Sequence, residues 1–311
     1  MFETKILDDY KGFGKCLYLT NGTVDVIASL DIGPRILRYG FVGEDNIFIA
    51  DTANKCIGPQ TSNELKEYYG EEHYYSTYGG HRIWQAPEVH PKTHYPDNFP
   101  IEYEILDNGV KLIAPVQFRN NIQSSITLTF RGEGTEIDLH QEIKNTSRFP
   151  QEMALWTITM CASGGVGIVR RNDLYLPGSP NMTIALWSNA NFLNNTTFIG
   201  NKYITVVQPA ENPAIKFGLQ LQHGDSYYVN GDTVFKKEFE PVFPYGNYTD
   251  RGCNFETYSC TNFTELEFLS EYKKVASGSS ISLDESWSLY RKPCDFNPKN
   301  DASIDALISK L

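Results

Sequence analysis

Residues 101–145 read IEYEILDNGVKLIAPVQFRNNIQSSITLTFRGEGTEIDLHQEIKN, and the fold class follows from their pattern. Four runs of strand length either alternate between apolar and polar residues or are continuously apolar: Ile101–Leu106, Gly109–Val116, Ser124–Phe130 and Glu136–Lys144. A period of two places successive side chains on opposite faces of a half-buried strand. The turn sequences Asp107-Asn-Gly109 and Arg131-Gly-Glu-Gly134 join these runs within a few residues. Such short connections predict an antiparallel meander.

The same pattern continues toward both ends of the chain. Further predicted strands are Cys16–Thr20, Thr23–Leu30, Asn46–Ala50, Met153–Cys161, Thr183–Trp187, Tyr203–Gln208, Ala214–Leu221, Ser226–Val229, Thr233–Lys237, Asn254–Cys260, Phe263–Ser270 and Ser286–Tyr290. About fifteen strands are more than a sandwich of about seven or a barrel of about eight strands holds. We therefore predict a mainly β protein, a large two-sheet antiparallel β-sandwich with a few short helices.

The chain organisation predicts one domain over residues 1–311, because no Pro/Ser/Gly-rich linker interrupts it. Two smaller β domains in tandem are the alternative. Thr61-Ser-Asn-Glu64 fits a capping box that opens a short helix ending near Tyr69. A second short helix is predicted at the C-terminus, where Ile304, Leu307, Ile308 and Leu311 share one face after the cap candidates Asn300 and Asp301.

Composition and charge narrow the class of protein. The chain is 41% hydrophobic and 21% charged, which suits a globular fold with a sizeable core. Lys and Arg total 27 against 38 for Asp and Glu, a formal charge of −11 without a basic stripe, so we expect no nucleic-acid partner. No stretch of about eighteen apolar residues occurs, and the N-terminus does not resemble a signal peptide. We expect a cytoplasmic protein with no membrane association.

Metal and cofactor motifs are absent from the sequence. The six cysteines form no C-x-x-C pair, which argues against a zinc ribbon or a thioredoxin-type motif. His90-Pro-Lys-Thr-His94 has a spacing that suggests a metal site, but Pro91 and Pro96 oppose the helical pairing this would need. We therefore predict no metal and no cofactor.

Residues Thr77–Glu88 read TYGGHRIWQAPE and form the strongest candidate for a functional site. Two glycines, an imidazole, a guanidinium, an indole, an amide and a carboxylate occur together, and Pro87 opposes a continuing strand ladder. We interpret the stretch as a loop rather than a core strand. Its substrate-binding candidates are Arg82, Trp84, Gln85 and Glu88.

Several segments together resemble the galactose mutarotase-like proteins. They are Gly33-Pro-Arg-Ile36, Gly79-Gly-His-Arg-Ile-Trp84 followed by Ala-Pro-Glu, Lys144-Asn-Thr-Ser147, Lys216-Phe-Gly218 and Gly252-Cys-Asn-Phe-Glu-Thr-Tyr258. The resemblance spans most of the chain. It implies a large β-sandwich of the supersandwich kind with a sugar-binding cleft on one concave sheet face. In enzymatic members it implies interconversion of the α and β anomers of an aldose.

The resemblance also assigns roles to residues of this chain. Glu256 stands in the context of the family's catalytic glutamate, and His81-Arg82 stands where the family has Asn-Arg. Trp156 stands where the family's catalytic histidine is expected. His81 and His94 are then the candidates for the catalytic acid, because both lie in or just after the Gly-Gly-His-Arg segment.

Two further residues are expected to contact substrate. Trp156 could form a stacking wall for the apolar face of a sugar. Glu265 lies in the alternating run Phe263-Thr-Glu-Leu-Glu-Phe268, where an outward-facing strand carboxylate is the alternative interpretation.

Three function classes stay open at this point. The first is an aldose 1-epimerase-like isomerase that uses general acid and base groups without a metal or cofactor. The second is a non-catalytic carbohydrate-binding protein, and a weaker third is a polysaccharide lyase-like enzyme. The acidic charge favours a neutral sugar over a sugar phosphate as partner. Neither the sugar nor the oligomeric state follows from the sequence.

Overall fold

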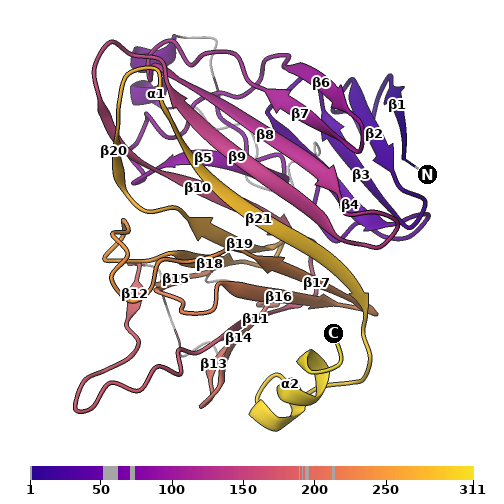
Figure 1. The fold of residues 1–311 in the computed structure, drawn as a ribbon, viewed down its shortest axis with the longest axis vertical. Coiled ribbons are helices and arrows are strands. Elements are labelled where there is room, and N and C mark those ends of the chain that lie inside the picture. The colour runs from indigo at the N-terminus through magenta and orange to yellow at the C-terminus, as the bar shows by residue number, and fades with distance from the viewer. Residues whose placement is uncertain are drawn as a thin grey trace.

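Two large antiparallel sheets make up most of the protein (Figure 1). The computed structural model describes residues 2–51, 62–70, 74–188, 190, 192, 196–211 and 214–311. Within them, all strand pairs are antiparallel and only two short helices occur. The predicted fold class, a mainly β sandwich with a few short helices, is confirmed.

The larger sheet contains the strands that carry the candidate site. In spatial order its strands are β1 (Glu3–Leu7), β2 (Cys16–Thr20), β3 (Val24–Ser29), β4 (Arg35–Phe41), β5 (Gly80–Ala86), β10 (Gln151–Cys161), β19 (Thr264–Leu269), β18 (Phe255–Ser259), β15 (Ile215–Leu219) and β12 (Ile184–Leu186). The short strand β20 (Lys273–Val275) pairs with the start of β10. Segments from the first, middle and last parts of the chain thus become neighbours.

The smaller sheet contains the predicted meander of residues 101–145. In spatial order its strands are β13 (Thr197–Ile199), β14 (Tyr203–Val207), β11 (Val166–Arg170), β16 (Asp225–Asn230), β17 (Thr233–Glu238), β21 (Ser280–Arg291), β9 (Ile137–Asn145), β8 (Ile122–Phe130), β7 (Gly109–Ile113) and β6 (Glu102–Leu106). The last four are the predicted runs, displaced by at most a few residues at their ends. The predicted meander is confirmed.

The hydrophobic core lies between the two sheets. In β9, Ile137, Leu139 and Ile143 are buried, whereas the intervening Asp138 and His140 point away from the core. The same core includes Leu155 of β10 from the larger sheet, so side chains from both sheets share it. Burial of apolar surface at about 25 cal/mol per Å² drives this packing. The organisation of residues 1–311 as one domain stays a prediction.

Two capped helices complete the described structure. Helix α1 (Asn63–Tyr69) begins after Ser62, whose hydroxyl accepts a hydrogen bond from the Leu65 amide. Thr61 of the predicted capping box lies outside the described residues. Helix α2 (Asp301–Ile308) begins after Asn300, as predicted, and buries Ile304 and Leu307. Neither helix is long and apolar enough to cross a membrane, as far as the described residues show.

Two predictions about local structure were wrong. Residues 80–86 are not a loop but strand β5, which pairs with β10 from Ala86↔Ala154 to Gly80↔Met160. The glycines before it allow close backbone approach: at φ +69° a Cβ on Gly80 would lie 2.3 Å from the Ile36 carbonyl oxygen. The predicted strand Asn46–Ala50 forms only isolated bridges, Phe48↔Cys161 and Ala50↔Gly79. In residues 80–86, pairing with β10 overrode local composition.

Candidate functional site

Strand register brings charged and aromatic side chains together on one face of the larger sheet. Directly opposed residues in antiparallel strands point to the same face. One such row across the sheet is Gly218, Glu256, Glu267, Ile158 and Arg82. The adjacent rows contribute Lys216, Tyr258 and Glu265 on one side and Trp156 and Trp84 on the other. We call Arg82, Lys216, Glu256, Glu265 and Glu267 the charged cluster.

Lys216 is the centre of the charged cluster. Its Nζ lies 2.8 Å from Oε2 of Glu256 and 3.1 Å from Oε2 of Glu267. The Trp156 indole donates a hydrogen bond of 2.7 Å to the same Glu267 oxygen. Glu267 is therefore held by two donors, whereas Oε1 of Glu256 has no hydrogen-bond partner among the described residues. A buried acceptor without a partner is uncommon and calls for an explanation, such as an ordered water or a bound ligand.

Arg82 holds the other end of the charged cluster. Its guanidinium lies 3.5 Å from Oε1 of Glu265 and 4.5 Å from the ring centroid of Trp84. Cation–π contact and ion pairing together fix the orientation of the arginine. Trp84 and Tyr258 are half-buried, and the side chains of Lys216 and Glu265 keep 12% of their surface exposed, so the cluster reaches solvent only at these points.

Burial brings two carboxyls of the cluster to titrate near neutrality. It raises the pKa of Glu256 to about 8, against the opposing effect of Lys216. Burial also raises the pKa of Glu265 to about 7, assisted by the charge of Glu267 and opposed by Arg82. For Lys216, burial alone would lower the pKa, but Glu267 and Glu256 raise it above its ordinary value. Lys216 therefore stays a cation at the pH at which the two glutamates titrate.

Glu88 and His94 form the rim of the site. His94 Nε2 lies 2.8 Å from Oε1 of Glu88, and this hydrogen bond lowers the pKa of Glu88. The His94 ring stacks on Tyr75 at a centroid distance of 4.7 Å and lies 5.3 Å from Trp84. The positive charges of Lys216 and Arg82 act on Glu88 as well. Of the two predicted acid candidates, His94 is the one at the site.

His81 does not point toward the charged cluster. It lies on the other face of β5 from Arg82, fully buried between the sheets, so its assignment as catalytic acid does not fit the structure. Its ring nitrogens lie 2.8 Å from the Thr159 hydroxyl and 2.7 Å from the side-chain amide oxygen of Gln141. Burial and the charge of Lys237 lower the pKa of His81 well below its usual range, which keeps the imidazole neutral.

Gln85 is also directed away from the site. It alternates with Trp84 along β5 and is buried on the core side, so the predicted contact with substrate does not fit either. The two errors have one cause. In a strand, alternate residues point in opposite directions, and a loop interpretation does not impose that alternation.

Lys216 and Glu267 are the functional residues that sequence reasoning missed. Both lay within segments singled out beforehand, Lys216-Phe-Gly218 and the alternating run that includes Glu265. Alternation alone places Glu265 and Glu267 on one face. The short connection between β18 and β19 predicts their pairing, but no local signal predicts the pairing of β15 with β18 that adds Lys216.

Solved structures share the architecture over almost the whole chain. A "putative aldose 1-epimerase" from Klebsiella pneumoniae superimposes with a TM-score of 0.61 at 14% identity, covering 99% of this chain and 86% of that one. A galactose mutarotase-like protein from Lactobacillus casei gives 0.54 at 8% identity, covering 88% of this chain and 100% of the other. This chain has the galactose mutarotase-like fold. Neither a family model nor a curated protein matches the sequence.

A third structure agrees with this fold. A galactose mutarotase-like protein from Clostridium acetobutylicum has a TM-score of 0.51 at 8% identity, over 94% of this chain and 98% of that one. At such identities the likeness establishes the mutarotase-like fold, which the sequence segments had indicated. The roles of individual residues rest on the geometry above.

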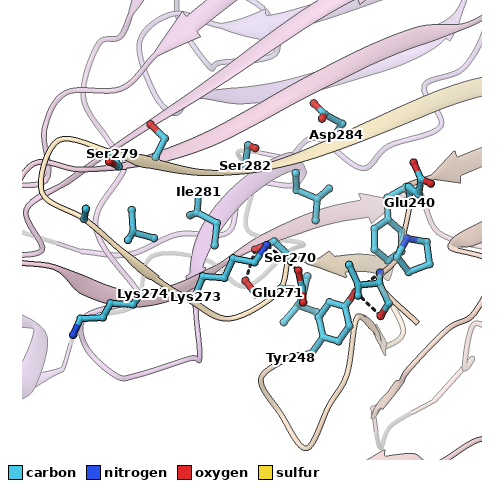
Figure 2. A pocket seen from close by; sticks show the side chains of 18 residues that line it. Glu240, Tyr248, Ser270, Glu271, Lys273, Lys274, Ser279, Ile281, Ser282 and Asp284 are labelled. Carbon is cyan, nitrogen blue, oxygen red and sulfur yellow. Dashed lines mark hydrogen bonds and ion pairs between the residues drawn. The ribbon is translucent and has the colours of Figure 1, made fainter. Parts of the chain in front are cut away.

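A cleft of about 820 Å³ lies elsewhere in the mutarotase-like fold (Figure 2). Strands β20 and β21 and the segment around Tyr248 form its walls. Its labelled charged side chains include Glu271 and Lys273, which pair with each other at 2.8 Å; Lys273 is exposed and Glu271 is half-buried. Perturbed, buried acids mark catalytic sites more strongly than volume does. We therefore place the candidate site at the charged cluster. No group of three or more His, Cys, Asp or Glu in the described part of the chain is arranged to hold a metal ion.

Proposed function

We propose that the protein binds a sugar over the charged cluster and interconverts the α and β anomers of an aldose. The observation that carries the proposal is the pair Glu256 and Glu265, two buried carboxyls on one sheet face with pKa values raised to about 8 and about 7. At neutral pH such a pair holds both a proton donor and a proton acceptor. The mutarotase-like fold supports a carbohydrate ligand, although fold alone does not determine function.

The reaction needs only two proton transfers. A base removes the proton of the anomeric hydroxyl while an acid protonates the ring oxygen, and the bond between the anomeric carbon and the ring oxygen breaks to leave an open-chain aldehyde. Rotation about the adjacent carbon–carbon bond and the reverse transfers close the ring to the other anomer. We assign the base to Glu256, whose Oε1 has no hydrogen-bond partner among the described residues, and the acid to Glu265. Because the pKa of Glu256 is the higher of the two, the active form is the less populated one, in which Glu256 is ionised and Glu265 is protonated. His94, held by Glu88, is the alternative acid.

The aromatic side chains suit the rest of a sugar. Trp84 and Trp156 meet edge to face at a centroid distance of 5.6 Å and form a wall beside the cluster. Sugars present apolar C–H faces that pack on such rings. Arg82 and Glu88 would orient hydroxyl groups, and the excess of glutamates over cations in the cluster supports a neutral sugar.

Mutarotation of the favoured sugar should show a bell-shaped dependence of rate on pH, with its maximum between the pKa values of about 7 and about 8. Below both values both carboxyls are protonated and no base remains, whereas above both values no acid remains. The rate depends on the fraction of protein in which one carboxyl is protonated and the other is ionised. That fraction has the same bell-shaped dependence on pH whichever carboxyl is the acid, so the profile does not depend on which residue is assigned as acid or base. Polarimetry across pH 5 to 10, corrected for the spontaneous rate, measures it. A rate that rises steadily through this range would contradict the pairing.

Replacing the half-buried Trp84 by alanine should weaken sugar binding about tenfold, since an aromatic contact of this kind contributes about 0.5–1.5 kcal/mol beyond its buried area. The turnover rate should change less, because the wall contacts the ground state and the transition state alike. Isothermal titration calorimetry gives the binding constant and polarimetry the rate. Phe149→Ala, at an aromatic residue that is 75% exposed, is the comparison variant. An unchanged affinity in Trp84→Ala would remove the stacking wall from the proposal.

A non-catalytic sugar-binding protein is the second candidate function. Trp156 favours it, because it occupies the position where the resemblance places a histidine and its indole is already bound to Glu267. Accelerated mutarotation of glucose or galactose by the wild-type protein supports the enzyme. Sugar binding without acceleration supports the binding protein.

A further inference from the structure

A second hollow opens on the same face of the larger sheet, next to the charged cluster. Ala185 of β12 is directly opposite Gly218, and Gly218 is directly opposite Glu256. Ala185 lines a pocket of about 250 Å³ that the segment before β12 and the segment before β18 enclose. We call it the outer pocket. Ala185 and Gly218 have little or no side chain, so no large side chain fills the space above this part of the sheet.

Cys253 joins the outer pocket to the charged cluster. It lines the pocket. A Cβ added to Gly218 would lie 2.6 Å from Sγ of Cys253 and 3.3 Å from Cγ of Glu256. The Cys253 thiol and the Glu256 side chain therefore flank the same point of β15. Glycine at position 218 permits this approach, which a side chain would block. A ligand over Glu256 is thus one side chain away from the outer pocket.

The lining of the outer pocket combines apolar and hydrogen-bonding groups. Leu176, Met182 and Pro244 supply apolar surface, and Gln220 and the exposed Arg251 supply polar groups. Sugar rings need both kinds of contact, since their C–H faces are apolar and their hydroxyls accept and donate hydrogen bonds.

Two exposed tyrosines are chain neighbours of lining residues. Tyr175 precedes Leu176 and is 82% exposed, and Tyr245 follows Pro244 and is 92% exposed. The backbone before Cys253 is also unusual, because Asp250 and Arg251 both have positive φ, at 50° and 64°. Consecutive non-glycine residues in this region of φ are uncommon and tend to cluster at ligand sites. The backbone is therefore strained at the position that carries the Arg251 side chain.

We propose that the outer pocket binds a second sugar ring, so that the preferred substrate is the reducing-end unit of a disaccharide or longer oligosaccharide. The inference rests on the proposed function, which places a free anomeric carbon over Glu256 and Glu265. The reacting ring must keep that carbon unsubstituted. Its link to the second ring therefore runs through a non-anomeric hydroxyl, directed past Cys253 toward Arg251 and Tyr245.

The test compares glucose and galactose with the reducing disaccharides maltose, cellobiose and lactose. Polarimetry measures anomer interconversion, and titration calorimetry measures binding by the same protein. We expect kcat/KM for at least one disaccharide to exceed that of its reducing-end monosaccharide about tenfold, through a lower KM. Equal values for every pair would overturn the second-ring site while leaving the proposed function intact.

Variants of the outer pocket make the test specific. Tyr245→Ala and Arg251→Asn should remove most of the preference for the disaccharide and leave monosaccharide turnover unchanged. Asparagine tolerates positive φ, so Arg251→Asn removes the guanidinium without adding backbone strain. Tyr245→Phe should retain the preference, and Phe149→Ala, at an exposed aromatic of the turn before β10, is the matched control.

The remaining outcomes are also decisive. Variants that alter mono- and disaccharides equally would show that the pocket residues act on the cluster rather than on a second ring. A protein that binds disaccharides more tightly but accelerates no mutarotation would support the outer pocket and overturn the catalytic proposal. A protein that neither binds nor converts any of these sugars would overturn both.

Discussion

Glu256→Gln is expected to slow enzyme-catalysed mutarotation by at least about 10²-fold, since general base catalysis contributes about 10²–10⁴-fold. The amide keeps the size of the side chain but cannot accept the anomeric proton at neutral pH. Lys216, which now pairs with Glu256 at 2.8 Å, keeps Glu267 as a partner at 3.1 Å and so remains held. Sugar affinity should therefore change little, as tryptophan fluorescence or calorimetry can show.

The matched control is Glu104→Gln on the edge strand β6, an exposed glutamate remote in sequence from the charged cluster. It removes one negative charge without touching the site and should leave the rate unchanged. Glu265→Gln should resemble Glu256→Gln if the two carboxyls work as a pair. Full activity in Glu256→Gln would exclude this residue as the base.

Lys237→Met should lower the free energy of unfolding by about 3–5 kcal/mol, the cost of leaving one member of a buried ion pair without its partner. Lys237 is buried between the sheets, with its Nζ 3.0 Å from the Thr159 hydroxyl and 3.4 Å from Oε1 of Glu285. Methionine has a similar volume, so the loss would report the charge and hydrogen bonds rather than a cavity. Urea unfolding followed by tryptophan fluorescence measures the change.

The double variant Lys237→Met/Glu285→Gln separates the two contributions. With the carboxylate also removed, no uncompensated charge stays buried, and the double variant should be more stable than the sum of the two single effects predicts. Lys236→Met, at the neighbouring half-buried position of β17, is the matched control and should cost little. A loss for Lys237→Met no larger than for Lys236→Met would show that the buried pair contributes no net stability.

Much of the fold could be predicted from local pattern alone. The alternation in Ile137–Asn145 directs Ile137, Leu139 and Ile143 to one face, and that face is the buried one in β9. Asn300 caps α2 as its side chain and position predict. These features depend on residues within a few positions of each other, so a single sequence contains the information that specifies them.

The candidate site was predictable only in part, and β5 shows why. Arg82 and Trp84 were chosen for their chemistry and lie at the site, but His81 and Gln85 were chosen for the same reason and face the core. The chemical character of these side chains does not show which of them face the site and which face the core. The pairing of residues 80–86 with residues 154–160 decides which face of β5 is covered by the second sheet.

The sequence by itself determined the strand-rich class, the two short helices and the residue types from which a sugar site could be built. Only the tertiary structure decided that Lys216 from β15, Glu256 from β18, Glu267 from β19 and Arg82 from β5 meet on one face. The physical reason is that side-chain alternation is a local property of the backbone, whereas the order of strands in a sheet depends on the burial of apolar surface summed over the whole chain. The raised pKa values of Glu256 and Glu265 arise from that burial. The pair of carboxyls that we propose as acid and base therefore forms only when the protein folds.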